Sequence, residues 1–225
     1  MVSFLRRLKD PLAGATHFLA VLLALPATTW LLWKAAQVAT GWHLVSFAVF
    51  GAGMILLYSA STLYHWLPDT PRLEAVFRRL DHMMIFVLIA ATYTPICLVP
   101  LRGGWGWSLL GIVWGIALTG IVMKTVWIQA PAWLSTLMYL FMGWLVVIGL
   151  KPLTAALSAG ALFWLTLGGV FYTLGAIIYA VNRPNPWPRW LGAHEIFHLL
   201  TMAGTGAHVW LMARYVMTLN GEVNV

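Results

Sequence analysis

Residues 192–216 read GAHEIFHLLTMAGTGAHVWLMARYV, a long apolar segment with two histidines and a glutamate at its head. About 20 predominantly apolar residues suffice for a helix to cross a bilayer, so this segment predicts a transmembrane helix. Positions i and i+4 share a helix face, so His194 and His198 point the same way. Polar groups are costly to bury in lipid, which indicates that these side chains have a partner or a function there.

The rest of the chain repeats this apolar pattern. Hydrophobic residues make up 61% of the 225 residues and charged residues 8%, whereas a soluble domain carries about 25% charged residues. The sequence therefore predicts an all-α membrane protein, a single seven-helix transmembrane domain over residues 1–225. The predicted spans are about 14–35, 43–66, 81–100, 105–124, 131–151, 160–181 and 192–216. The longest connection, about 67–80, is expected to contain a short interfacial helix at 73–80.

The distribution of Lys and Arg predicts the orientation of the spans. With a cytoplasmic N-terminus the basic residues divide into nine inside (Arg6, Arg7, Lys9, Arg72, Arg78, Arg79, Lys124, Arg183, Arg189) and four outside (Lys34, Arg102, Lys151, Arg214). The positive-inside rule then favours N-terminus inside and C-terminus outside, and the first apolar stretch is expected to be a retained helix rather than a cleaved signal. Because these basic residues lie mostly in short loops, the net charge of +7 does not indicate nucleic-acid binding.

Two further motifs are expected at the same membrane depth as His194. Ser61-Thr-Leu-Tyr-His65 ends the second span, and Leu80-Asp81-His82 opens the third. His65, His194 and His198 could together bind a zinc ion and leave one coordination position open, as catalytic zinc sites do. Asp81 could then hydrogen-bond a zinc-bound water or an imidazole, and Ser61, one turn before His65, could support the same water.

Other interpretations of these residues are open. The two histidines of 194–198 could bond to loops or headgroups at the interface, Asp81 could be a first-turn acid worth about 1 kcal/mol at a helix N-terminus, and Ser61 could bond to its own backbone. His82 is expected to have a packing or hydrogen-bonding role, and no role is fixed for His17 or His208. Cys97 is the only cysteine, which excludes an intramolecular disulfide and a thiolate metal site built on several cysteines.

Glu195 has two interpretations. His194-Glu195-Ile-Phe-His198 satisfies H-E-x-x-H, in which the glutamate of soluble metalloproteases is the general base. Alternatively, Glu195 faces the interface and pairs with Arg183 or Arg189 in the preceding loop.

These motifs together resemble those of the bacterial hemolysin III family, which belongs to the progestin and adipoQ receptor superfamily with the adiponectin receptors. The resemblance covers nearly the whole chain and rests on four motifs in the same order and spacing: Ser61–His65, Leu80–His82, Thr92–Pro95 and His194–His198. It implies a seven-helix bundle with a cytoplasmic N-terminus in a bacterial inner membrane.

The resemblance also implies functional residues. It implies a zinc ion near the cytoplasmic face, held by His65, His194 and His198, with Asp81 linked to it through water and Ser61 as the motif serine. The adiponectin receptors have no glutamate at the position of Glu195, and their cytoplasmic N-terminal domain is not expected here. A receptor role for a protein hormone is therefore not carried over.

Several functions follow as hypotheses. The first is a zinc-dependent hydrolase of a lipid amide or ester, favoured by the resemblance of the superfamily to alkaline ceramidases, with Asp81, or else Glu195, moving the proton. The second is a sensor or regulator of membrane lipid state with structural zinc. A pore-forming hemolysin is disfavoured because few interior charges are available to line a channel, and an intramembrane metalloprotease depends on Glu195 alone. Membrane lipids are the expected partners, and the sequence leaves a homo-oligomer open.

Overall fold

The structure of the chain is a computed structural model that describes residues 8–67, 70–127, 129–187 and 190–219. Seven helical spans are long and apolar enough to cross a membrane, so the predicted seven-helix bundle is confirmed. The elements are α2 (Pro11–Val38), α3 (Gly41–Trp66), α4 (Pro71–Leu98), α5 (Gly104–Val126), α6 (Ala132–Trp144), η1 (Leu145–Gly149), α7 (Leu150–Ala156), α8 (Ala159–Val181), α9 (Ala193–Arg214) and η2 (Val216–Thr218). The span predicted at 131–151 consists of α6, η1 and α7 in succession.

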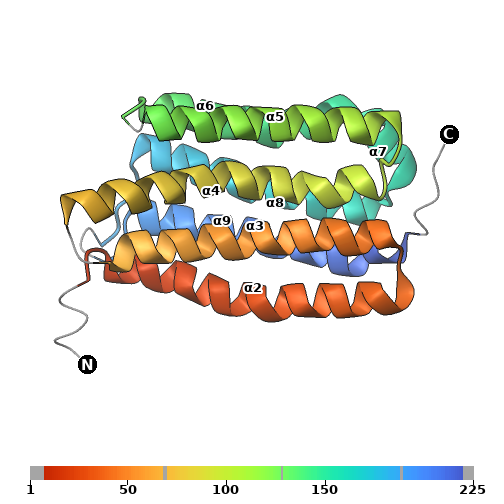
Figure 1. Cartoon of the computed structure of the whole chain (residues 1–225), viewed down its shortest axis with the longest axis horizontal. Helices are drawn as coiled ribbons and strands as arrows, with labels where there is room; N and C mark the ends of the chain where they lie inside the picture. Colours follow the sequence, from red (N-terminus) through yellow and green to blue (C-terminus); the bar gives the residue numbers. More distant parts are fainter. Residues whose placement is uncertain (1–7, 68–69, 128, 188–189, 220–225) are drawn as a thin grey trace.

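The helices run side by side along the long axis of the molecule (Figure 1). Helix α3 packs between α2 and α4, and α9 packs against α8 and α2. As the chain crosses back and forth, α3 ends at the same end of the bundle at which α2, α4 and α9 begin. This end, called the site end below, carries the C-terminal turn of α3 and the N-terminal turns of α2 and α9.

Helix α4 begins earlier than the sequence predicts. It starts at Pro71, runs without a break to Leu98, and therefore includes the predicted interfacial helix at 73–80. Proline in the first turn favours a helix start because its missing N–H would have no helical partner there, and residues 72–80 contain neither glycine nor another proline. Asp81 consequently lies inside α4, and the interpretation of Asp81 as a helix-start residue is wrong.

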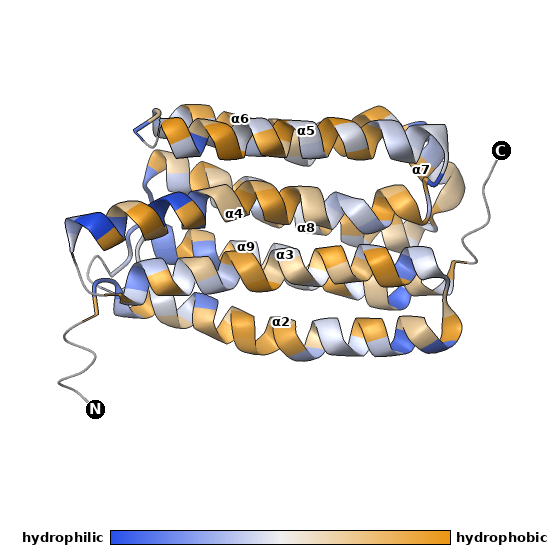
Figure 2. Cartoon of the chain, in the orientation of Figure 1, coloured by the Kyte–Doolittle hydropathy of each residue, from blue (hydrophilic) through white to orange (hydrophobic). Residues whose placement is uncertain are grey.

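Large apolar side chains cover the outside of the bundle. Leu118, Val122 and Ile148 are each more than half exposed, as are many similar residues, and Figure 2 shows apolar residues along most of each helix, with hydrophilic ones gathered at the site end of α4. Such a surface suits contact with lipid rather than with water. Inside, small residues let helices approach closely: Gly53 of α3 lies against Ala91 of α4, and Gly168 of α8 lies against His208.

Candidate metal centre and the adjoining cavity

Three histidines from two helices converge at the site end. His65 lies in the last turn of α3, while His194 and His198 lie one turn apart near the start of α9. Their ligand-capable nitrogens all lie within 4.8 Å of one another, and the Nε2 atoms of His65 and His194 are 3.2 Å apart. The structure thus brings together the three histidines that the sequence analysis selected as metal ligands.

The spacing of one nitrogen pair suits a zinc ion. Two nitrogens bound to one tetrahedral zinc at about 2.0–2.1 Å lie about 3.3 Å apart, which agrees with the 3.2 Å between His65 and His194. His65 and His198 are each only 2% exposed, so water does not compete strongly for their nitrogens. The donor set of three imidazoles therefore fits a borderline-soft divalent metal with one position left open.

Helix α2 supplies the outer partners of two of these histidines. Asp10, the residue before α2, has a carboxylate oxygen 3.0 Å from His65 Nδ1. His198 Nδ1 lies 3.2 Å from the carbonyl oxygen of Ala13 and 3.2 Å from the hydroxyl of Thr16. Such bonds fix the ring orientation and leave Nε2 free for a metal. The hydrogen bond with His65 also lowers the pKa of the Asp10 carboxyl, which keeps Asp10 ionised at neutral pH.

Asp10 was not among the residues selected from the sequence. It precedes Pro11, and an aspartate before a proline is a helix-start signal that could have placed it at the head of the first span. Its contact with His65 spans 55 positions of the chain and depends on how α2 docks against α3, which no local pattern specifies.

Asp81 and Ser61 lie beside the histidines. Asp81 is 8% exposed in the third turn of α4, and the groups near its carboxylate include His65, Ser61 and Tyr179. Ser61 is fully buried one turn before His65, and in the described structure its hydroxyl makes no bond to its own helix. The backbone-bonding interpretation of Ser61 is therefore not supported, and the serine is placed to hold a polar group next to Asp81.

Glu195 bonds to the start of its own helix. Its carboxylate accepts a hydrogen bond of 2.8 Å from the backbone N–H of Gly192, which closes a capping arrangement at the start of α9. Among the described residues Glu195 forms no ion pair with Arg183, and Arg189 lies outside the described residues. Glu195 stabilises the helix turn that carries His194 and His198, and it is not part of the histidine cluster.

The remaining histidines of interest occupy three different places. His17 of α2 stacks on His198 with ring centroids 3.6 Å apart, and both its nitrogens are buried without a partner in the described structure. His82 lines a cavity beside Asp81, and His208 lies deeper, with Nε2 3.2 Å from the carbonyl oxygen of Leu165. Only His17 thus extends the histidine cluster itself.

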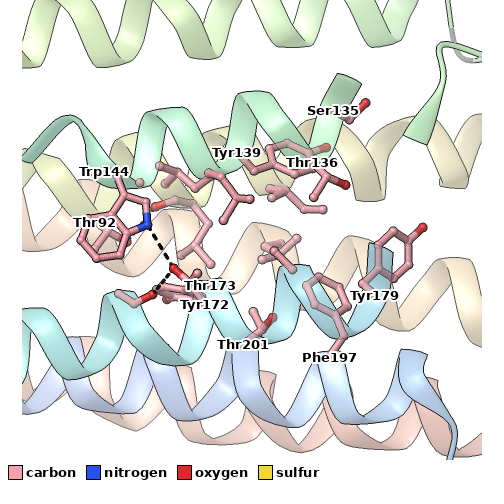
Figure 3. Close-up of a pocket in the computed structure, with 18 of the residues that line it drawn as sticks. Thr92, Ser135, Thr136, Tyr139, Trp144, Tyr172, Thr173, Tyr179, Phe197 and Thr201 are labelled. Carbon is pink, nitrogen blue, oxygen red and sulfur yellow. Dashed lines mark hydrogen bonds between the residues drawn. The ribbon is translucent and has the colours of Figure 1, made fainter. Parts of the chain in front are cut away.

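A cavity of about 570 Å³ opens beside the histidines. His194, His198 and Asp81 form part of its wall at the site end. Most of the rest comes from α4, α6, α8 and α9, with single contributions from α2, α3 and α5 and a few from η1 and α7. In Figure 3, Tyr179 and Phe197 lie at one end of this space and Trp144 and Tyr172 at the other. Its volume lies in the range of pockets that hold drug-sized ligands, and most of its lining is apolar.

Tyrosines and threonines interrupt the apolar lining. Tyr172 of the lining bonds to Thr205 at 2.8 Å, and Thr205, which is not a lining residue, also bonds to Tyr58 at 2.6 Å. Trp144 donates to Thr173 of the lining at 3.1 Å (Figure 3). Nearer the histidines, Tyr179 packs 5.9 Å from the His194 ring and faces Asp81. Tyr179 was missed at the sequence level because an aromatic residue near a span end is ordinary interfacial composition.

Comparison with known proteins agrees with this arrangement of motifs. The sequence model of the family described as "Haemolysin-III related" matches residues 5–209. The chain belongs to this family. It is 41% identical to the hemolysin-3 homolog of Bacillus subtilis over 92% of this chain and 95% of that protein, and 36% identical to hemolysin-3 of Bacillus cereus over 96% of each.

A more distant relative is human monocyte to macrophage differentiation factor, 25% identical over 78% of this chain and 72% of that protein. A 57-residue stretch is also 39% identical to the adiponectin receptor protein of Drosophila melanogaster. The predicted resemblance to the hemolysin III family and to the adiponectin receptors is therefore confirmed. The match over residues 5–209 includes all three histidines of the cluster.

Proposed function

We propose that this haemolysin-III related membrane protein is a zinc-dependent hydrolase of a lipid amide or ester. The observation that carries the proposal is a cluster of three largely enclosed imidazoles, two of which line a mostly apolar cavity together with Asp81. A purely structural metal site would be expected to be closed by a fourth protein ligand. Here the described His, Cys, Asp and Glu side chains supply three close ligands, and the cavity gives a substrate access to the remaining position.

The proposed chemistry divides between the metal and the chain. Bound zinc supplies Lewis acidity, which polarises a lipid carbonyl and makes water acidic enough to lose a proton near neutral pH. Asp81 accepts that proton and returns it to the leaving oxygen or nitrogen, and the Ser61 hydroxyl beside Asp81 is available to hydrogen-bond the same water. The Tyr179 hydroxyl is available to donate a hydrogen bond to the carbonyl oxygen, and the acyl chain lies in the apolar part of the cavity.

The Asp10 and Ala13 contacts contribute orientation. They hold the His65 and His198 rings by Nδ1, so the two rings keep the direction needed for ligation before metal binds. Following the positive-inside rule, we place the site on the cytoplasmic side of a bacterial inner membrane, where a lipid substrate would enter laterally and contribute to membrane lipid homeostasis.

The alternative is a sensor of membrane state in which zinc only joins α3 to α9. The observation in its favour is that the three ligands come from these two helices and would fasten them together. The hydrolase and the sensor differ in turnover and not in metal content.

Purified protein with measured zinc content, incubated with N-acylsphingosine, with monoacylglycerol and with the phosphorylated form of each, tests the proposal. We expect zinc-dependent release of fatty acid, lost on chelation and in Asp81→Asn. Fully zinc-loaded protein that releases no fatty acid from amides or esters would refute the hydrolase and leave the sensor.

A further inference from the structure

Two cationic side chains lie on the cavity wall next to the candidate metal centre. Lys124, in the last turn of α5, is 2% exposed and lines the cavity. Arg78 lines it from α4, one turn before Asp81, a rise of about 4.5 Å along the helix. His82 lines the same wall and faces both cations. A group of positive charge therefore borders the end of the cavity where the histidines lie.

These cations lack a counterion among the described residues. The ion pairs there are Lys9 with Glu74 and His65 with Asp10. Asp81 is the one carboxylate on the described cavity wall, and its neighbours include His65, Ser61 and Tyr179, with no ion pair to Arg78 or Lys124 among the described residues. Arg78 Nε and His82 Nδ1 are buried without a hydrogen-bond partner. Buried charge and buried unpaired donors are costly, so the wall is built for an anion that the chain does not itself supply.

Snorkelling to bilayer headgroups does not account for Lys124. A lysine that snorkels places its ammonium at the outer surface of the bundle, whereas Lys124 is almost completely enclosed and contributes to the cavity lining. By contrast, Arg72 on α4 and Lys151 on α7 are exposed and do not line the cavity. Lys124 is thus an enclosed cation on the cavity wall, and Arg78 beside it is partly buried.

We propose that Lys124, Arg78 and His82 form a subsite for the phosphate of a single-chain lipid whose acyl chain occupies the apolar part of the cavity. A phosphate monoester carries about −1.5 to −2 charges at neutral pH and matches two cations, whereas a carboxylate would leave one buried cation uncompensated. Phosphate oxygens accept several hydrogen bonds, and the side chains of Arg78, Lys124 and His82 together provide several donors.

This subsite defines the substrate class and rests on the proposed function. With the phosphate one helix turn from Asp81 and the chain in the apolar part of the cavity, the acyl linkage falls beside the three histidines. Hydrolysis would add the hydroxyl of water to the acyl carbon, break its bond to the headgroup oxygen or nitrogen, and transfer the proton to that atom. The products are a fatty acid and a phosphate-bearing alcohol or amine.

Binding of ether-linked lipids to the zinc-loaded, detergent-purified protein tests the subsite separately from turnover. The probes are 1-O-octadecenyl-glycerol-3-phosphate, the same ether without phosphate, oleic acid and inorganic phosphate, titrated calorimetrically in a neutral detergent. Ether bonds resist hydrolysis, so an inactive protein, which would refute the hydrolase, still reports on phosphate recognition. Lys124→Gln and Arg78→Gln remove each charge, Lys124→Arg retains it, and Lys151→Gln and Arg72→Gln are matched controls.

We expect the phosphate ether to bind at least about tenfold more tightly than the neutral ether, and each of the two cavity variants to lose about tenfold in affinity for the phosphate ether alone. Lys124→Arg and both controls should retain the preference. Equal binding of the two ethers by the wild-type protein would overturn the proposal, even if a variant failed to fold. Oleic acid binding as tightly as the phosphate ether would overturn the phosphate assignment, and inorganic phosphate binding as tightly would overturn the lipid assignment.

Discussion

Replacing His65 by alanine tests whether the histidine cluster binds a metal that joins two helices or only packs between them. His65 is the only cluster ligand on α3, and the other two lie on α9. Without His65 the remaining pair, four residues apart on one helix, could hold a metal only weakly and could no longer fasten α3 to α9. We therefore expect the zinc content of purified His65→Ala to fall from about one ion per chain to nearly none.

The effect on stability follows from linkage. A ligand that binds only the folded state at 100 times its dissociation constant stabilises that state by about 2.7 kcal/mol. For a chain of this length, 1 kcal/mol moves the melting temperature by roughly 2–4 °C. Zinc should therefore raise the melting temperature of the wild-type protein by roughly 5–10 °C over the chelated protein, and this zinc-dependent difference should vanish in His65→Ala.

Each variant is compared with itself with and without zinc. The stability lost through the cavity that alanine leaves is present in both measurements and therefore cancels. His43→Gln is the control, because His43 is another fully buried histidine of α3 but lies in its first turn, at the opposite end of the helix. It is expected to lower overall stability, since His43 Nε2 lies 3.1 Å from the carbonyl oxygen of Val216, and to keep the zinc-dependent shift. Full zinc occupancy in His65→Ala would refute the three-histidine assignment.

The other predictions concern the residues around the cluster. Asp81→Asn should keep most of the zinc, measured by elemental analysis, and lower lipid hydrolysis by about 10²–10⁴-fold; zinc loss as large as in a histidine variant would make Asp81 a direct ligand instead. Asp10→Asn should weaken zinc affinity by about 10–100-fold, because His65 loses its ionised partner, and unchanged affinity in a competitive chelator titration would contradict this. Glu195→Gln should leave hydrolysis and zinc content nearly unchanged, since a glutamine can still accept the Gly192 N–H bond; near-total loss of activity with intact zinc would instead support the H-E-x-x-H mechanism.

Hydropathy and helix periodicity were enough to predict the seven spans and the meeting of the three histidines. His65 closes one apolar segment and His194 opens another, so alternating crossings place both at one end of the bundle. The i, i+4 spacing then brings His198 to the same face as His194. These relations depend on segment ends and helix periodicity, which are local properties of the sequence.

The start of α4 was predicted wrongly because hydropathy measures burial in lipid rather than helix formation. Glu74, Arg78 and Arg79 make residues 71–80 too polar for a span, yet these residues form helix readily. The extension beyond the apolar segment has a consequence for the site. It makes Arg78 and Asp81 successive positions on one continuous helix face, so the cation and the carboxylate reach the cavity with a fixed separation.

The site also depends on a third helix that the histidine pattern does not reveal. Helix α2 contributes no metal-ligand candidate, yet Asp10 contacts His65, the Ala13 carbonyl contacts His198, and His17 stacks on the His198 ring. The first turns of α2 therefore hold ligands from both α3 and α9, and an error in docking α2 would misalign the two rings together. Because these contacts join residues far apart in sequence, they follow from the packing of the bundle and could not be predicted from any one segment.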